Sequence, residues 1–176
     1  MANYSNVKGF TVQTLSSDPV ASQIAGGSWS SGGNLPGPRD ETTGAGTLTA
    51  GIQFGGYSPP ESAYKPETFE YNGTAWTEVA EVNSGRPNAA SRSGTSTDGL
   101  LVSGGARTVN CEHWNGSSWT EIANVATGRY GIGGQGSTST AAVAFGGNTA
   151  ASDPAGVVTT EEFTAADFQI KTVTTS

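Results

Sequence analysis

Residues 70–79 read EYNGTAWTEV, and residues 113–122 repeat this phrase as HWNGSSWTEI. Each copy places an Asn-Gly pair between two short runs that carry aromatic or β-branched residues. Asn-Gly is the pair that two-residue type I′ hairpin turns prefer, because both turn positions need a positive φ angle. A degenerate copy, EFTAADF, covers residues 162–168, and IAGGSW at residues 24–29 fits the same template. The phrase therefore predicts a β-hairpin that occurs once in each of several similar units.

A second phrase, a small apolar run ending in Gly-Gly, precedes each hairpin. It reads IQFGG at residues 52–56, LVSGG at residues 101–105 and VAFGG at residues 143–147. A third phrase begins with Arg39, Arg86 or Arg129 and ends in Gly followed by Ser or Thr. Four short strands in a unit of about 45 residues are typical of one β-propeller blade. The residues expected to anchor these units are Trp29, Gly55, Gly56, Trp76, Gly104, Gly105, Trp119, Gly146, Gly147 and Phe168.

The order of these phrases predicts an all-β fold of propeller-type repeats. Three full blades are expected at about residues 38–81, 86–125 and 129–174, after an N-terminal partial blade. We divide the chain into an N-terminal attachment arm or strand at residues 1–20 and a repeat domain at residues 21–176. Propellers usually need at least about four blades to close. Closure therefore requires the N-terminal residues or a partner chain, and the sequence leaves both open.

The composition argues against several classes of function. The 176 residues include 8 Lys and Arg against 15 Asp and Glu, which gives a net charge of −7, so no nucleic-acid partner is expected. One Cys and one His argue against a disulfide, a zinc site or a His-rich metal centre, and no cofactor is expected. No apolar run reaches the ~18 residues of a membrane span. The first residues are too polar for a signal peptide.

Two residue patterns were candidates for catalysis. Cys111 and His113 stand two positions apart on an expected strand and so point to one face, but the arrangement occurs once and a buried thiol is the favoured interpretation. The adjacent acids Asp40-Glu41 and Glu161-Glu162 point to opposite faces of a strand, so neither pair supplies the facing carboxyl groups that a glycosidase needs. We therefore expect no catalytic residue and no enzymatic activity.

The loops between the Gly-Gly pair and the following aromatic residue differ in length. The first and third loops are six and seven residues longer than the second. In repeat folds such insertions gather on one face, which is often the binding face. The residues expected to form surface-binding loops are Tyr57, Pro59, Tyr64, Lys65, Asn148 and Asp153. The alternative is a tolerated insertion without a ligand.

Several stretches resemble a known group of repeat proteins. The Gly-Gly pair, the aromatic residue before Asn-Gly and the Trp after it are similar to kelch-like repeats. The segments GAGTLTAGIQFGG (44–56), SWSSGGNL (28–35) and FTVQTLSSDP (10–19) resemble virion structural proteins of marine bacteriophages, chiefly those that infect cyanobacteria. The resemblance covers nearly the whole chain. This chain has few units, and the last one lacks Asn-Gly and Trp, which indicates a terminal unit.

The resemblance implies a non-enzymatic particle component, made in the host cytoplasm and placed on the exterior of the virion. A small single domain favours a capsid decoration protein of the knob type. The alternative is the receptor-binding module of a tail fibre or adhesin, recognising a host cell-surface glycan. The major capsid protein or another virion protein is the expected partner, and a second copy of the chain is a further candidate. Attachment to the particle is expected of Lys8, Phe10, Val12 and Leu15 in the N-terminal arm.

Overall fold

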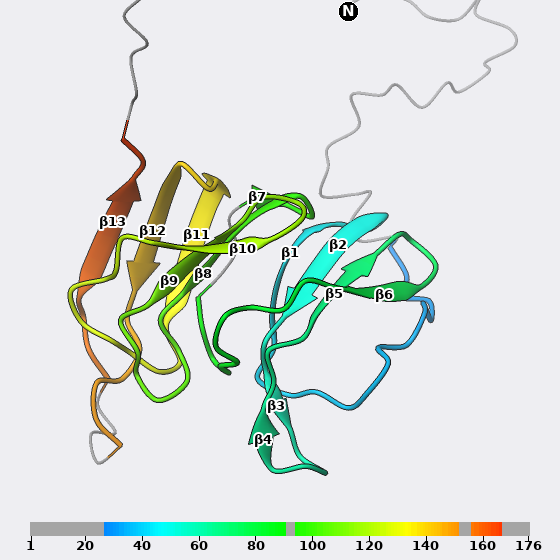
Figure 1. Cartoon of the computed structure of the whole chain (residues 1–176), viewed down its shortest axis with the longest axis horizontal. Coiled ribbons are helices and arrows are strands. Elements are labelled where there is room, and N and C mark those ends of the chain that lie inside the picture. Colours follow the sequence, from blue (N-terminus) through cyan, green and yellow to red (C-terminus); the bar gives the residue numbers. More distant parts are fainter. Residues whose placement is uncertain (1–26, 91–93, 152–155, 167–176) are drawn as a thin grey trace, which may run out of the picture. The chain divides into compact units, whose positions relative to one another are not determined.

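The computed structural model describes residues 27–90, 94–151 and 156–166, which form thirteen β-strands and no helix (Figure 1). All strand pairs are antiparallel, so the predicted all-β class is confirmed. The chain divides into two units, Met1–Ser31 and Gly32–Ser176, and all the strands belong to the second. No described residue lies in a helix suited to cross a membrane.

The first sheet lies within the predicted unit at residues 38–81. Its four strands pair in the order β1-β2-β5-β6, with bounds Thr43–Thr47, Ala50–Phe54, Thr68–Tyr71 and Trp76–Val79. The short strands β3 (Tyr57–Ser58) and β4 (Ala63–Tyr64) pair only with each other, in the long loop after the Gly-Gly pair. The first loop insertion is therefore a hairpin of its own.

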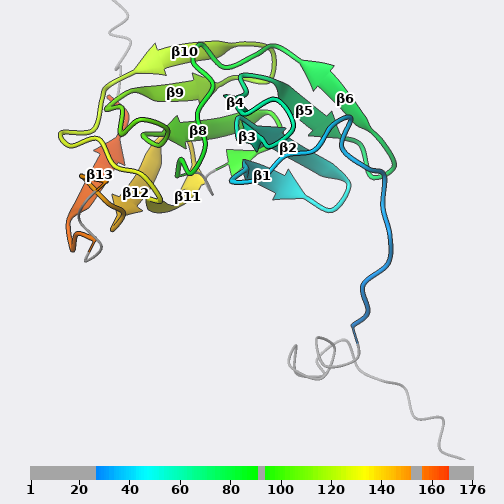
Figure 2. The ribbon, with the colours of Figure 1, turned by 90° about the horizontal axis from the view of Figure 1, so that it is seen from below.

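The second and third sheets lie within the units predicted at residues 86–125 and 129–174. The second pairs in chain order through β7 (Gly94–Thr95), β8 (Asp98–Val102), β9 (Cys111–Trp114) and β10 (Trp119–Ile122). The third contains β11 (Gly133–Thr138), β12 (Ala141–Phe145) and β13 (Thr160–Thr164). Strand β7 lies beside both β1 and β11. Figure 2 shows the three sheets following one another along the chain. The strands described here do not close into a ring.

The loops that contain Asn-Gly are longer than the sequence predicts. Tyr71 pairs with Trp76, so four residues rather than two connect β5 to β6. Only Gly73 of the predicted pair has a positive φ, 91°, and the Asn72 side chain instead accepts the backbone N–H groups of Thr74 and Ala75 at 2.9 Å. The second hairpin repeats this geometry. The prediction of type I′ turns is wrong, because the Asn side chain stabilises a longer loop.

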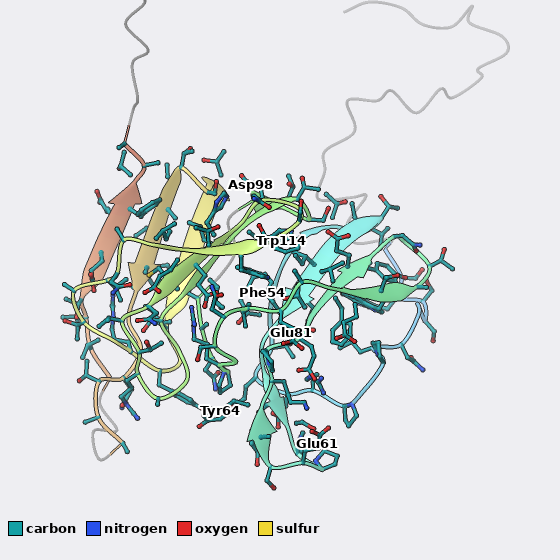
Figure 3. The ribbon with its side chains drawn as sticks, viewed as in Figure 1. Phe54, Glu61, Tyr64, Glu81, Asp98 and Trp114 are labelled. Atoms are coloured by element: carbon teal, nitrogen blue, oxygen red, sulfur yellow. The ribbon has the colours of Figure 1, made fainter. Side chains whose placement is uncertain are left out.

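The main core lies between the first and second sheets. Trp119 packs edge-on against Phe54 with ring centroids 4.8 Å apart, and its indole N–H donates to Thr68 Oγ1 at 3.1 Å. Trp114 lies 5.4 Å from Trp119 and donates its own N–H to the Ser96 carbonyl at 2.9 Å. Figure 3 shows Phe54 and Trp114 pointing into the space between the two sheets. Both tryptophans are buried with their N–H groups paired, which removes the cost of burying a polar group.

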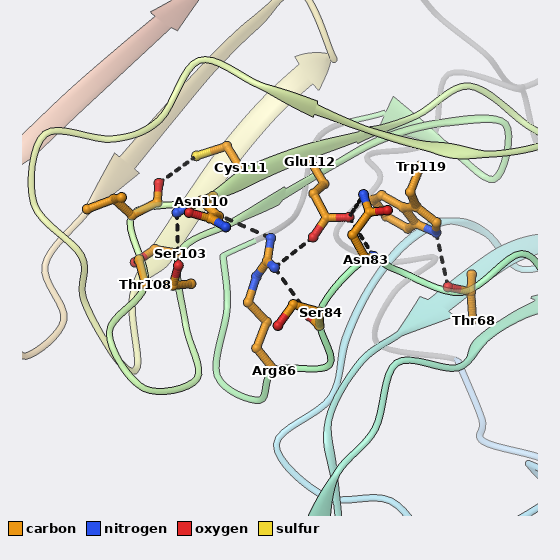
Figure 4. Close-up of polar contacts among 11 residues, drawn as sticks. Thr68, Asn83, Ser84, Arg86, Ser103, Thr108, Asn110, Cys111, Glu112 and Trp119 are labelled. Atoms are coloured by element: carbon orange, nitrogen blue, oxygen red, sulfur yellow. Dashed lines mark hydrogen bonds and ion pairs between the residues drawn. The ribbon is translucent and has the colours of Figure 1, made fainter.

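A buried arginine opens each of the last two units and pairs with a glutamate on the third strand of the same sheet. Arg86 Nη1 lies 2.7 Å from Glu112 Oε1, and both side chains are 2% exposed (Figure 4). The other carboxylate oxygen accepts the backbone and side-chain N–H groups of Asn83 at 2.8 Å. Arg129 and Glu161 repeat the pair at 2.8 Å. Buried charges of this kind need a partner, so each pair fixes the start of a unit to its sheet.

The arginine that opens the first unit, Arg39, has different partners. Phe69 occupies the register position that Glu112 holds in the second sheet, as the partner of the residue two before the left-handed turn. Arg39 lies 5.9 Å above the Phe69 ring and 3.4 Å from Glu67 Oε1. Arg39 thus keeps an ion pair, but its glutamate is Glu67 and not the residue at the Phe69 position, where the contact is a cation over an aromatic face.

The Gly-Gly phrase is shifted by one residue in the second unit. Gly55 and Gly146 have a φ of 64°, and the residue in the same place in the second unit is Ser103 with a φ of 56°. The counterpart of the pairs at 55–56 and 146–147 is therefore Ser103-Gly104 and not Gly104-Gly105. Ser103 tolerates this conformation with its hydroxyl 2.7 Å from the Arg129 backbone nitrogen, a contact that glycine could not make.

The remaining expected anchors differ in their surroundings. Trp76 is half-buried, packs 4.9 Å from Tyr71 and donates its N–H to the Gly33 carbonyl at 3.1 Å. Trp29, expected as a packing anchor, is instead fully exposed. Phe168 lies outside the described residues.

A mainly apolar hollow of about 240 Å³, lined by Val102, Cys111 and other residues, lies between the second and third sheets. It occupies the place where the third sheet would carry the counterpart of Trp119.

Candidate functional site

The hairpin β3–β4 presents two tyrosines at the end of the first sheet. The rings of Tyr57 and Tyr64 meet edge to face with centroids 6.0 Å apart, and Tyr64 is 51% exposed. The backbone of Tyr57 pairs with that of Asp40 through two 3.0 Å hydrogen bonds, which hold the hairpin to the start of the unit. Figure 3 shows Tyr64 and Glu61 on the part of the molecule that extends beyond the first sheet. The hairpin thus displays an aromatic surface on a fixed base.

Charges at the base of the hairpin neutralise one another. Lys65 Nζ lies 2.6 Å from Glu61 Oε2 and 3.3 Å from Glu67 Oε1. The hydrogen bond from Lys65 is the main reason that the pKa of Glu61 is lowered, and the Glu61 carboxylate raises the pKa of Lys65 in return. Lys65 is therefore engaged within the chain, and the hairpin surface consists of Tyr57, Pro59 and Tyr64 rather than of a free cation.

A second group of side chains lies at the starts of the units. The Tyr130 hydroxyl lies 2.8 Å from both carboxylate oxygens of Glu41, to which it donates, and Arg107 lies 5.7 Å above the Tyr130 ring. Arg107 Nη2 also donates to Asn148 Oδ1 at 3.1 Å. Burial and then the Glu41 carboxylate raise the pKa of Tyr130, and Tyr64 adds to this effect. The backbone of Asp40 pairs with that of Tyr57, and Glu41 follows Asp40, so this group adjoins the β3–β4 hairpin. We call the two together the loop face: Glu41, Tyr57, Tyr64, Arg107, Tyr130 and Asn148.

Several non-glycine residues at or beside the loop face have positive φ angles, a backbone conformation that costs free energy. Glu41 and Arg107 are non-glycine residues with positive φ angles of 51° and 65°, and Asn88 between the first two units has a φ of 50°. Asn88 N–H donates to the Glu41 carbonyl, and Gly131 N–H donates to the Asn88 carbonyl. Each left-handed non-glycine residue costs of order 1–3 kcal/mol, and such residues cluster at binding sites. The chain therefore fixes these side chains in place before any ligand arrives.

The structure brings together some of the predicted surface residues. Tyr57, Pro59, Tyr64 and Lys65 share the β3–β4 hairpin, and Asn148 from the third loop joins Arg107. Asp153 and the attachment residues Lys8, Phe10, Val12 and Leu15 lie outside the described residues.

Sequence reasoning considered Glu41 only as half of the acid pair Asp40-Glu41, and it missed Arg107 and Tyr130. The signal that could have found two of them is their position, because Glu41 and Tyr130 follow the repeated Arg39 and Arg129 by two residues and one residue. Arg107 had no such signal, since it lies in the short second loop, which carries no insertion.

The catalytic candidates of the sequence do not assemble into a nucleophile and base. Burial raises the pKa of the Cys111 thiol, which contacts the Val109 carbonyl at 3.6 Å. His113 Nε2 lies 2.8 Å from Asp98 Oδ1 instead of beside the thiol. Glu161 is held by Arg129, and Glu41 by Tyr130. No group of three or more His, Cys, Asp or Glu residues in the described ranges is placed to hold a metal ion.

The loop face combines the groups that recognise polar, hydroxyl-rich ligands. Tyrosine rings offer flat apolar faces. Glu41 already accepts from Tyr130, and Arg107 donates to Asn148, so a polar ligand would have to share or replace these hydrogen bonds. This arrangement can bind and orient a ligand. It places no nucleophile beside an activating base.

Comparison with known proteins shows a shared fold. No protein-family model and no curated protein matches this chain. Among solved structures, the one described as "Structure of YjhT" superposes with a TM-score of 0.65 at 16% sequence identity. The match covers 79% of this chain and 47% of that chain, so this chain spans about half of the length of that protein. At this identity the likeness concerns the fold alone.

Proposed function

We propose that the three sheets are kelch-like β-propeller blades. Each sheet runs as an antiparallel meander, and a repeated arginine fixes the start of each unit. A similar fold occurs in a solved chain that is about twice as long as the part matched.

We propose that the chain is a non-enzymatic virion structural protein that decorates the exterior of a bacteriophage capsid. The observation that carries the proposal has two parts. The repeated sheets are held together by ion pairs within the chain, and the side chains available for contact lie on the loop face. The placement on a virion rests on the resemblance of residues 10–56 to phage repeat proteins. A net charge of −7 would help to keep decorated particles apart by like-charge repulsion.

In this proposal residues 1–20 attach the protein to the major capsid protein or another virion protein, and the loop face points outward. Deletion of residues 1–16 should leave a folded domain that no longer joins particles. The measurement is co-sedimentation of full-length and truncated protein with particles that have been stripped of it. Equal co-sedimentation of both forms contradicts an N-terminal attachment arm.

A second function, recognition of a host cell-surface glycan by a tail-fibre module, is favoured by the loop face itself. Aromatic rings beside fixed polar groups are the usual platform for sugars. Binding of purified protein to host cells tests this function, with Tyr64→Ala as the probe. Leu48→Ala is the matched control, because Leu48 is 86% exposed in the β1–β2 turn, at the opposite end of the sheet. Loss of cell binding only in Tyr64→Ala would favour the receptor module over decoration.

A further inference from the structure

The interface between the first two sheets shows how one unit recognises its neighbour. Trp119 of the second sheet occupies a site on the first sheet made by Phe54 and Thr68, which are direct register partners on β2 and β5. Phe54 contacts the indole ring and Thr68 accepts its N–H, and both residues are fully buried. We call such a Phe–Thr pair a tryptophan seat.

The third sheet carries a second tryptophan seat that no described residue fills. Phe145 and Thr160 are register partners on β12 and β13, and Gly146 follows Phe145 with the same φ of 64° that Gly55 has after Phe54. Ala144 is buried in a cluster with Ala90, toward the second sheet. Because alternate residues of a strand point to opposite faces, Phe145 faces away from the second sheet. Phe145 is 44% exposed and Thr160 is exposed, whereas their counterparts are buried.

The first sheet carries the complementary aromatic pair at the other end of the array. Tyr71 and Trp76 are register partners on β5 and β6, as Trp114 and Trp119 are on β9 and β10. Their ring centroids lie 4.9 Å apart, close to the 5.4 Å of the tryptophan pair. Tyr71 lies three residues after Thr68 on the same strand and so points to the face opposite the filled seat. The Trp76 N–H reaches only the exposed Gly33 carbonyl.

We propose that a second copy of this chain docks head to tail, with the Tyr71–Trp76 pair of one copy in the Phe145–Thr160 seat of the other. Thr160 would then replace Gly33 as the acceptor of the indole N–H, as Thr68 serves Trp119. This inference rests on the interface between the first and second sheets, whose residue pairs recur at the two ends of the array. It is independent of the proposed virion function.

Two copies that engage at both ends would close a ring with two-fold symmetry. Closed propellers typically have about four to eight blades, and the three described sheets of one copy are too few. Two copies provide six sheets and cover both open ends, which would otherwise expose sheet surface to non-specific pairing. The solved fold that this chain resembles is matched over 47% of its length, which leaves room for a second half.

The first test is the mass of the full chain in solution by light scattering after gel filtration. Wild type should elute at twice 17.8 kDa. Phe145→Glu should be monomeric and folded, because Phe145 is already partly exposed in a single copy. Ser117→Glu, which adds the same charge in the exposed β9–β10 turn, should remain dimeric. Thr160→Val should raise the dissociation constant about 30-fold, because it removes one net hydrogen bond of about 1 kcal/mol at each of the two interfaces of the ring.

Mixing two defective variants tests the head-to-tail geometry. Trp76→Ala lacks the inserted residue and Phe145→Glu lacks the seat, so each should be monomeric alone. Their mixture should form a heterodimer, since Trp76 of the second variant can still enter the seat of the first. A monomeric wild type at every concentration overturns the proposal, as does a mixture without heterodimer. Unfolding of a monomeric Phe145→Glu variant would show that the seat is filled from within the same chain, which also overturns it.

Discussion

At the scale of single residues, stability depends on the buried ion pair between Arg86 and Glu112. Glu112 accepts hydrogen bonds from Arg86 and from both nitrogens of Asn83 in a site where both charged side chains are 2% exposed. Glu61 pairs with Lys65 at a similar distance, but its side chain is 58% exposed. Water screens the second pair and not the first, so their contributions to folding should differ widely.

Replacing Glu112 by Gln should lower the free energy of unfolding by about 3–5 kcal/mol, because the Arg86 charge stays buried without a counter-charge. Chemical denaturation monitored by tryptophan fluorescence measures this loss. Glu61→Gln is the matched control, and its midpoint should equal that of wild type. Similar midpoints for the two variants would contradict the assignment of Arg86 and Glu112 as a structural pair.

Tyr130 should ionise at higher pH than an ordinary tyrosine, because burial and the Glu41 carboxylate raise its pKa. A raised pKa means that folding favours the neutral phenol. The stabilisation is therefore complete below about pH 10, the unperturbed pKa, and is lost as the pH rises through the folded value. Absorbance of tyrosinate, compared between wild type and Tyr130→Phe, isolates this titration. Glu41→Gln should move it to lower pH; an unchanged titration in that variant would remove Glu41 from the site.

Particular residues show what sequence can and cannot predict at this scale. The repeated arginines were visible as a phrase, but their partners were not, because Glu112 and Phe69 occupy equivalent positions with unlike chemistry. The Ser103 substitution in the Gly-Gly phrase led to a one-residue error. A serine in the left-handed region is recognisable only from its φ angle and its hydroxyl contacts.

At the scale of elements, the sheets and the insertions behave as separate parts. The registers of the first sheet run within residues 43–79 and do not include β3 or β4. The two strands of the β3–β4 hairpin pair with each other, and an isolated bridge from Tyr57 to Asp40 joins the hairpin to the start of the unit. The period of the repeats therefore predicted the three sheets, whereas the hairpin inside the first loop had no repeated counterpart from which to predict it.

Replacing residues 58–63 by two glycines should remove the projecting hairpin and leave the sheets intact. The thermal midpoint should fall by no more than a few degrees, since Ser58 is the one buried side chain among the residues removed, and the circular dichroism of the sheets should persist. Binding of any ligand to the loop face should be lost in the same variant. Cooperative unfolding at a much lower temperature would show instead that the hairpin is part of the core.

At the scale of the whole molecule, the chain is a short array of similar sheets with unlike ends. The repeat length predicted where each sheet lies, because each unit forms its own meander. Closure was not predictable, since it depends on whether the open seat at Phe145 and Thr160 is filled from the same chain or another. The same limit applies to function, because the loop face assembles Glu41, Arg107 and Tyr130 from three different units.

Immunogold labelling of intact phage particles with an antibody to this chain tests the proposed function most directly. Decoration of the capsid predicts gold distributed over the particle head. Gold confined to the tail or its fibres would contradict decoration and favour the receptor module. Particles that carry no gold, while the isolated protein is recognised by the same antibody, would contradict both virion assignments.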